Sequence, residues 1–294
     1  MSHSTGPMTS NKLRKALSSV PLHIAAVGIC LIWSLPSVGL LISSLRPKND
    51  VFRSGWWTVF QHPFDFTQFQ LANYIHVLTA QGMGRAFLNS LTIAIPATVI
   101  PIAVAAFAGY AFAWMEFPGR QFLFVVVVGL LVVPLQMTLI PLLRVYNRLG
   151  LAGTFLGIWL AHTGYGLPFA VYLLRNFFGA LPRDLFESAY LDGASPLTAF
   201  TRLALPLSVP ALASLAIFQF LWVWNDLLVA LIYLGGTERV APLPLKLSAL
   251  VQSLGQDWHL LTAAAFVSMA LPLVVFFSLQ RYFVQGILAG SVKG

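Results

Sequence analysis

Residues 86–114 read AFLNSLTIAIPATVIPIAVAAFAGYAFAW, a run that contains no Asp, Glu, Lys or Arg. A helix needs about 20 residues to cross the hydrocarbon core of a bilayer, and this run is longer than that. Pro96 and Pro101 interrupt it, which a membrane helix tolerates because neighbouring helices satisfy the freed carbonyl groups. The run therefore predicts a kinked helix that crosses a membrane.

Similar apolar runs lie on both sides of this one. Together they predict six spans, at residues 20–45, 86–114, 122–143, 151–174, 207–234 and 260–279. Of the 294 residues, 58% are hydrophobic and 9% are charged, whereas about 25% are charged in an ordinary soluble domain. We expect an all-α, polytopic membrane protein with an N-terminal segment (1–19) and a single transmembrane domain (20–294).

The charges and the metal-binding residue types exclude several function classes. The formal net charge is +8, but the basic residues stand singly and form no stripe with interleaved aromatic residues. This pattern favours membrane lipid over nucleic acid as a partner. The six histidines are dispersed without the spacing of metal ligands, so we expect no metal site. The single cysteine, Cys30, excludes a disulfide within the chain.

The charges of the loops leave the orientation in the membrane open. An even number of spans puts both termini on one side, and the Lys and Arg residues divide almost evenly between the two sides. The positive-inside rule therefore hardly favours either orientation. The first span is too long for a secretory signal and no A-x-A cleavage site follows it, so we expect it to be retained.

The segment after the first span, residues 46–85, is rich in aromatic side chains. Such residues are typical of an amphipathic segment lying at the membrane interface, and a binding role is the alternative. The aromatic residues of this segment are Trp56, Trp57, Phe60, Phe64, Phe66, Phe69 and Tyr74.

The loop between the fourth and fifth spans, residues 181–206, predicts a helix, a turn and a second helix outside the membrane. Pro182 suits the first position of a helix. Gly193 stops that helix, because glycine enters the left-handed cap conformation without a Cβ penalty. Ser195 can cap the second helix and Pro206 ends it. The residues alone leave open whether this loop docks into a groove or is a plain surface loop.

The motif in this loop resembles the EAA loop of binding-protein-dependent ABC importers. That pattern is Glu-Ala-Ala, three residues, Gly, nine residues and Ile-x-Leu-Pro. Here Glu187-Ser-Ala189, Gly193 and Leu203-Ala-Leu-Pro206 stand at these positions. Ser188 replaces an alanine of the pattern and Leu203 replaces the isoleucine, and each is similar in size to the residue that it replaces.

The flanking motifs narrow the resemblance to carbohydrate-type permeases similar to the maltose transporter's shorter permease subunit. The sequence motifs occur in the same order and at similar spacing over nearly the whole chain, apart from the first 20 residues and part of the first outer loop. The matching motifs include Asn89-Ser-Leu91, Pro134-Leu-Gln136, Leu167-Pro-Phe169, Asp192-Gly-Ala-Ser195 and Trp224-Asn-Asp226.

The resemblance implies the transmembrane domain of a type I ABC importer in the bacterial plasma (inner) membrane, with both termini in the cytoplasm. It also implies three partners: a second homologous permease chain, two copies of an ABC ATPase and an extracytoplasmic sugar-binding protein. The loop would be cytoplasmic and would couple to the ATPase. The implied coupling residues are Glu187, Ser188, Ala189, Asp192, Gly193 and Pro206.

The chain itself has no Gly-x-x-x-x-Gly-Lys-Ser/Thr loop to hold nucleotide phosphates. We therefore expect a subunit that is not an enzyme and holds no cofactor, with ATP and Mg²⁺ bound in the partner ATPase. The implied cargo is a maltooligosaccharide, a sucrose-like or trehalose-like α-glucoside, or a glucosylglycerol-type osmolyte. An ABC permease for a non-sugar solute and an ion-driven secondary transporter are the alternatives.

Asp226 is the carboxylate that lies clearly within an expected span. An unpaired charge at the bilayer centre costs about 2.5 to 3.5 kcal/mol, so Asp226 should face a partner or a watery path. It is a candidate for the substrate pathway, and a structural pair near the outer interface is the alternative. The other candidates are Gln136, Trp222, Trp224 and Asn225, with Asn89, His162, Tyr165 and Gln219 as weaker ones.

Overall fold

The computed structural model describes residues 8–253 and 257–291, and within these ranges the regular structure is entirely helical. The expected all-α class is confirmed. In chain order the helical elements are α1 (Met8–Leu45), α2 (Lys48–Arg53), η1 (Trp56–Gln61), η2 (Phe66–Gln68), α3 (Ala72–Thr79), α4 (Met83–Trp114), α5 (Arg120–Gly129), η3 (Leu130–Val132), α6 (Leu135–Leu149), α7 (Phe155–Gly179), α8 (Arg183–Leu191), α9 (Pro196–Ala199), η4 (Phe200–Ala204), α10 (Leu205–Leu207), α11 (Val209–Trp224), α12 (Leu228–Leu234), α13 (Leu243–Ser253) and α14 (Trp258–Ser291).

Within the part of the chain that the structure describes, three helices are long and apolar enough to cross a membrane, namely α1, α4 and α14. Two further pairs reach that length only if each is counted as one bent span. The pair 120–132 and 135–149 is bent by 102°, and the pair 196–207 and 209–224 by 73°. The fourth expected span, 151–174, corresponds to α7, whose 25 residues have sufficient length but include polar side chains. The six expected spans can thus be located, but not as six straight helices.

Breaks within the helices correct two of the expected spans. The expected third span, 122–143, is divided at Val133 and Pro134, where proline cannot continue the backbone hydrogen bonds. The expected fifth span, 207–234, is divided at residues 225–227. There the Asp226 carboxylate accepts hydrogen bonds from the amides of Val229 and Ala230 and so starts a new helix.

The N-terminal boundary also differs from the expectation. Residue 20 is not a helix boundary, because α1 begins at Met8 and continues through it. Residues 1–7 of the expected N-terminal segment lie outside the described residues. The division into a segment at 1–19 and a domain at 20–294 stays a prediction.

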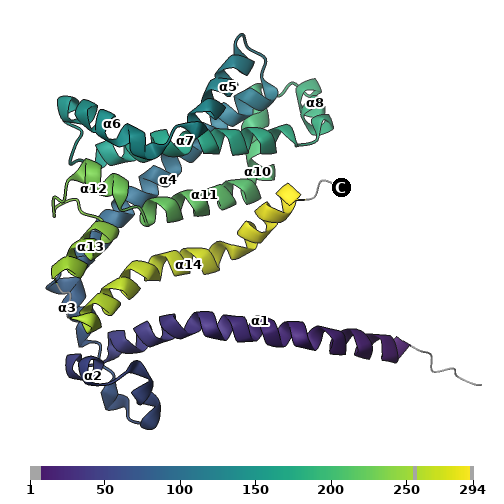
Figure 1. Ribbon diagram of the computed structural model, residues 1–294. Coiled ribbons are helices and arrows are strands. Elements are labelled where there is room, and N and C mark those ends of the chain that lie inside the picture. Colours follow the sequence, from purple (N-terminus) through teal and green to yellow (C-terminus); the bar gives the residue numbers. More distant parts are fainter. Residues whose placement is uncertain (1–7, 254–256, 292–294) are drawn as a thin grey trace, which may run out of the picture.

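Helix α4 packs along α7 and against α11, whereas α1 packs against α14 (Figure 1). The packing of α4 against α7 is tight because Gly109 faces the partner backbone: a Cβ there would lie 3.0 Å from the Arg175 nitrogen. Small residues allow such close approach between membrane helices. In Figure 1 the start of α1, the end of α14 and helix α8 all lie on the same side of the molecule.

The buried side chains form two clusters. The loop-side cluster packs under α8 and includes Tyr110, Leu174, Phe178, Phe186 and Phe200. The α12-side cluster lies towards α12 and α13 and includes Ile158, Val223, Trp224, Tyr233 and Leu243. The two clusters divide the protein into the two regions that carry the candidate sites.

The first outer segment, α2 to α3, presents several aromatic side chains at the surface. Phe64 is 87% exposed, and Trp57, Phe60 and Phe66 are also exposed. Trp56 instead packs over Gly39, where a Cβ would lie 2.7 Å from the indole nitrogen. A place for this segment at the membrane interface stays a prediction.

Candidate functional site

Helix α8 has the ends that its sequence predicts. It starts after Pro182 and is followed by Gly193, whose φ of 83° is in the left-handed region. The Gly193 amide donates to the Tyr190 carbonyl at 3.0 Å, and the Ala194 amide donates to the Ala189 carbonyl at 2.9 Å. These bonds close the C-terminus of α8. The predicted helix and its glycine stop are confirmed.

The second helix of the loop follows its predicted start but not its predicted end. Ser195 accepts a hydrogen bond from the Thr198 amide at 3.2 Å and caps α9, which begins at Pro196. Pro206 does not end the helix, because the chain continues through the π-helical turn η4 and α10 to Leu207. The bend instead follows Pro206 and is centred on Ser208.

The inner face of α8 is fixed to the membrane helices. Phe186 is 0% exposed and its ring stacks on Trp114 of α4, with 3.9 Å between the ring centroids. The Trp114 indole donates to the Phe178 carbonyl of α7 at 2.9 Å. The hydroxyls of Tyr110 and Tyr190 are 3.1 Å apart and form a second link. A displacement of α8 would therefore act directly on α4 and α7.

The outer face of α8 is open. Leu191 is 89% exposed and Leu185 is exposed as well, and so is Leu197 of the neighbouring helix α9. Of the expected coupling residues, Ala189 is half-buried and the others are exposed, namely Glu187, Ser188, Asp192, Gly193 and Pro206. An apolar centre with a charged rim is the usual composition of a protein-binding surface. We call this face the α8 docking face.

Asp226 finds its partners at the start of α12. Its two carboxylate oxygens accept from the amides of Val229 at 3.3 Å and Ala230 at 3.1 Å. The Nε2 atom of His162 lies 3.9 Å from the same carboxylate, and the two side chains are 1% (His162) and 11% (Asp226) exposed. The arrangement explains how the chain accommodates this carboxylate and brings His162, a weaker candidate, to the same place.

Trp222 and Trp224 point to opposite sides of α11. Trp222 is 37% exposed, and its ring meets the His162 ring edge-on. Trp224 is 1% exposed and donates from its indole nitrogen to the Ser268 carbonyl of α14 at 3.0 Å. Phe87 and Phe220 pack against Trp224. Trp224 is thus buried in the core, and its expected place on a pathway stays a prediction.

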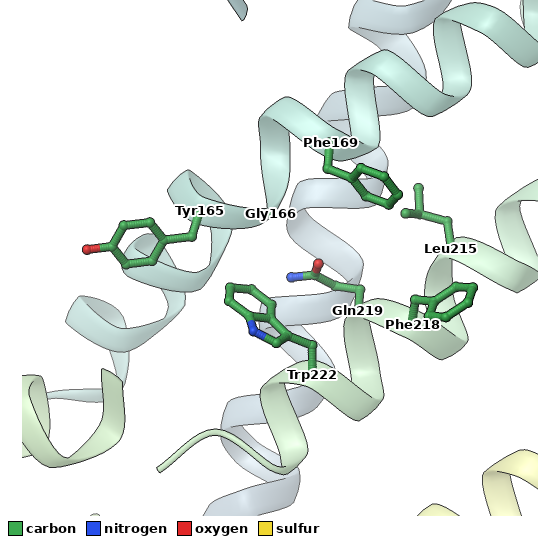
Figure 2. Close-up of a pocket in the computed structure, with 7 residues that line it drawn as sticks. All are labelled: Tyr165, Gly166, Phe169, Leu215, Phe218, Gln219 and Trp222. Carbon is green, nitrogen blue, oxygen red and sulfur yellow. The ribbon is translucent and has the colours of Figure 1, made fainter. Parts of the chain in front are cut away.

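Two neighbouring cavities share Tyr165 and Trp222 as a common wall. The first holds about 330 Å³ between α7 and α11 (Figure 2). Its lining is Tyr165, Gly166, Phe169, Leu215, Phe218, Gln219 and Trp222. The second holds about 610 Å³ and extends along η3 and α6. Its lining is Leu130, Leu131, Val133, Leu135, Met137, Thr138, Pro141, Leu142, Val145, Gly164, Tyr165, Pro168 and Trp222.

The remaining candidates lie away from these cavities or have structural roles. Gln136 and Asn225 are exposed but line neither cavity. Asn89 donates to the carbonyls of Arg239 and Ala241, and so ties α4 to the segment before α13. Gln219 lines the first cavity and also donates to the Ala97 carbonyl of α4 at 3.1 Å.

Thr138 is a cavity residue that the sequence did not single out. Its hydroxyl lies 2.9 Å from the Tyr165 hydroxyl, which in turn lies 2.8 Å from that of Tyr233. A lone threonine in an apolar helix gives no signal, because it ordinarily bonds its own helix. Among the described residues, no three His, Cys, Asp or Glu side chains gather into a group that could hold a metal ion.

The sequence matches a described protein family and named relatives. Residues 101–289 match the family described as "Binding-protein-dependent transport system inner membrane component". The chain is 69% identical to the osmoprotective compounds uptake permease protein GgtD of Synechocystis sp., over 97% of this chain and 96% of the relative. It is 43% identical to the alpha-glucoside transport system permease protein AglG of Rhizobium meliloti, over 97% of this chain and 100% of the relative.

A solved structure has the same fold. One chain of a bacterial ABC transporter involved in the import of the acidic polysaccharide alginate aligns with a TM-score of 0.74. The alignment covers 95% of this chain and 100% of that chain, at 21% identity. The bent spans described above therefore belong to an architecture that is already known from a transporter.

Proposed function

Because the chain belongs to the family of binding-protein-dependent transport system inner membrane components, we propose that it imports an osmoprotective glycoside or α-glucoside as one half of a bacterial ABC permease. The family match confirms the resemblance drawn from the EAA loop. Members are translocating, multi-pass membrane subunits and not enzymes, and the ATPase is a separate subunit. The proposed cargo is supported by the two relatives, which are named for osmoprotective compounds and α-glucosides.

The proposed complex contains a second homologous permease chain, two copies of an ABC ATPase that bind ATP and Mg²⁺, and an extracytoplasmic sugar-binding protein. The related alginate importer has been solved with a pentasaccharide-bound periplasmic protein, which supports such a partner. Lipid surrounds the apolar helix faces. The start of α1 and the end of α14 lie on the same side as α8, and this supports a cytoplasmic place for both termini and the loop.

The α8 docking face is the observation that carries this proposal. It combines exposed leucines with Glu187 and Asp192 on a helix whose other face is stacked on α4. We propose that it fits a cleft of the ATPase. ATP binding would then favour one arrangement of the spans and hydrolysis another, because the ATPase binds the two arrangements with different affinity.

The test replaces Gly193, whose left-handed backbone disfavours other residues. The complete complex in proteoliposomes, with its binding protein, would carry Gly193→Val or Gly193→Asn. Valine is strained at this φ, whereas asparagine tolerates it. We expect at least a tenfold loss of ATP-driven uptake for valine and a loss under threefold for asparagine. Equal, normal uptake by both variants would contradict the coupling role.

The same vesicles separate this proposal from an ion-driven transporter. We expect uptake of labelled glucosylglycerol, sucrose or trehalose only when ATP and the ATPase are present inside. Uptake that persists without the ATPase and stops when the ion gradients are dissipated would support the ion-driven alternative. ATP-dependent uptake of a non-sugar solute alone would support the other alternative.

A further inference from the structure

The larger of the two shared cavities lies where the helix pair of the third span is divided. Leu131, Val133 and Leu135 line it on either side of the bend. Irregular backbone at membrane depth is tolerated where it is buried or lines a water-filled cavity, and divided helices in transporters commonly surround the substrate. The volume of about 610 Å³ is within the usual range for a small-molecule site, about 300 to 1,000 Å³.

The polar groups of this cavity form a chain whose direction can be assigned. The Thr138 hydroxyl donates its single hydrogen to the Leu135 carbonyl at 2.7 Å. Between Thr138 and Tyr165 the donor must therefore be the Tyr165 hydroxyl, and between Tyr165 and Tyr233 it must be Tyr233. The hydrogens of all three hydroxyls are thus donated to acceptors within the protein.

What remains at the cavity wall is acceptor capacity. A hydroxyl oxygen has two lone pairs. The hydrogen bonds among these three residues use one lone pair on Thr138 and one on Tyr165. A bound molecule must donate hydrogens to these oxygens, as the hydroxyls of a sugar do. On the wall of the same cavity, the partly exposed indole of Trp222 offers an apolar face of the kind that packs against a ring.

We propose that Thr138, Tyr165 and Trp222 form a sugar subsite within this chain, which rests on the proposed function. Trp222 supports one face of a pyranose ring while Thr138 and Tyr165 accept hydrogen bonds from its hydroxyls. Tyr233 is 2% exposed and acts as a positioning residue that fixes the Tyr165 hydroxyl. The subsite selects ligands by the hydroxyl donors they carry.

The experiment compares hydroxyl-deleted sugars on the complete complex in proteoliposomes. The probe is labelled trehalose, sucrose or glucosylglycerol, whichever the wild type takes up, together with its monodeoxy and mono-O-methyl analogues on the glucosyl ring. We expect at least one analogue to enter with about tenfold lower efficiency than the parent sugar. In Thr138→Val and Tyr165→Phe this preference should fall to within about twofold, because the acceptors are gone.

Matched controls keep the interpretation specific. Thr92→Val and Tyr172→Phe remove the same groups from exposed positions outside both cavities and should retain the wild-type preference. Tyr233→Phe should weaken the preference partly. Trp222→Ala should raise the KM of uptake at least tenfold, and Trp222→Phe should restore part of the affinity, because a ring face is present again.

The outcomes separate the subsite from the proposed function. If the wild-type complex takes up none of these sugars in an ATP-dependent way, the proposed function fails. If it takes them up and the cavity variants keep the wild-type preference, the subsite is wrong. If Thr138→Val or Trp222→Ala instead releases the second permease chain during size-exclusion chromatography, the cavity holds a helix of that chain, and the subsite is again wrong.

Discussion

The α8 loop and the Tyr165–Trp222 cavities differ in how they are built. The loop is one continuous segment whose buried face rests on a stack between Phe186 and Trp114. The cavities instead bring together α6, α7 and α11, and the larger one lies where the third span is divided. The loop thus has an anchored inner face and an open outer face, whereas the cavities lie between separate helices. Under the proposed function, the first arrangement suits force transmission and the second suits a changing path.

The largest expected effect concerns the anchor of the loop. Phe186→Ala removes a fully buried ring from beneath α8, and such a truncation costs about 3 to 5 kcal/mol. We expect a clear fall in the thermal unfolding temperature and loss of ATP-driven uptake. Phe186→Leu should recover most of both. An Ala variant that unfolds and transports like the wild type would show that the loop is not anchored by this stack.

The next prediction contrasts the two tryptophans of α11. Trp224→Ala should lower the free energy of unfolding by about 3 to 5 kcal/mol, because the ring is buried and hydrogen-bonded. Trp222→Ala should cost less than about 1.5 kcal/mol, because its ring is 37% exposed. Chemical denaturation of both purified variants would measure the difference. A larger loss for Trp222 would reverse the assignment of core and cavity wall.

A moderate effect is expected at Gly166, which lines the first cavity. A Cβ at Gly166 would lie 2.7 Å from the amide of Gln219, which is also held by Ala97 of α4. Gly166→Ala should therefore cost about 1 to 3 kcal/mol through overpacking. In the Gly166→Ala/Gln219→Ala double variant the clash is absent, so the two losses should not add. Additive losses in a double-mutant cycle would mean that the two residues do not interact.

The smallest effect concerns an ion pair remote from both regions, between Lys48 of α2 and Asp257 before α14. The Lys48 ammonium, 2.6 Å away, lowers the pKa of Asp257 below its ordinary value of 3.8. The pair should therefore stabilise the fold fully above about pH 3.8, and this contribution should vanish as the pH falls through the lower, folded-state pKa. Lys48→Met should cost below about 1 kcal/mol at pH 7, with less difference in high salt.

Thermal unfolding of the Lys48→Met variant and the wild type across this pH range would measure the effect. A difference that stays constant through the acid range would exclude the ion pair as its cause. Because the pair is partly exposed, it also provides a scale against which the buried contacts of the two main regions can be judged.

The loop could be predicted from the sequence because its signals are local. Pro182, Gly193 and Ser195 each act on the backbone within a few residues. Gly193 and Ser195 act as expected, whereas Pro182 lies one position before the first residue of the helix. The apolar runs likewise predicted an all-helical membrane protein. The prediction that Pro206 ends the second helix failed, since proline fits the first turn of the short helix α10.

The cavity could be predicted only in part because it depends on tertiary packing. Trp222 and Trp224 stand two positions apart, which puts them on different faces of a helix, but the sequence does not tell which face is buried. The apolar run 122–143 predicted a single span, whereas the structure divides it at Pro134, with a bend of 102° after the short turn η3. Thr138 could be recognised as a candidate only from the structure, through its contact with Tyr165 on another helix.

The π-helical turn η4, at Phe200–Ala204, sets an angular relation between the loop and α11. A π turn holds one residue more than an α turn of the same span, and each residue of a helix rotates the chain by about 100°. Deleting one residue there would rotate α8 about the axis of α11, so that its inner face would no longer meet Trp114 and Tyr110 of α4. The spacing from Gly193 to Pro206 therefore acts as a rotational phase, and under the proposed function an ATPase shaped for one phase would meet a different surface in the other.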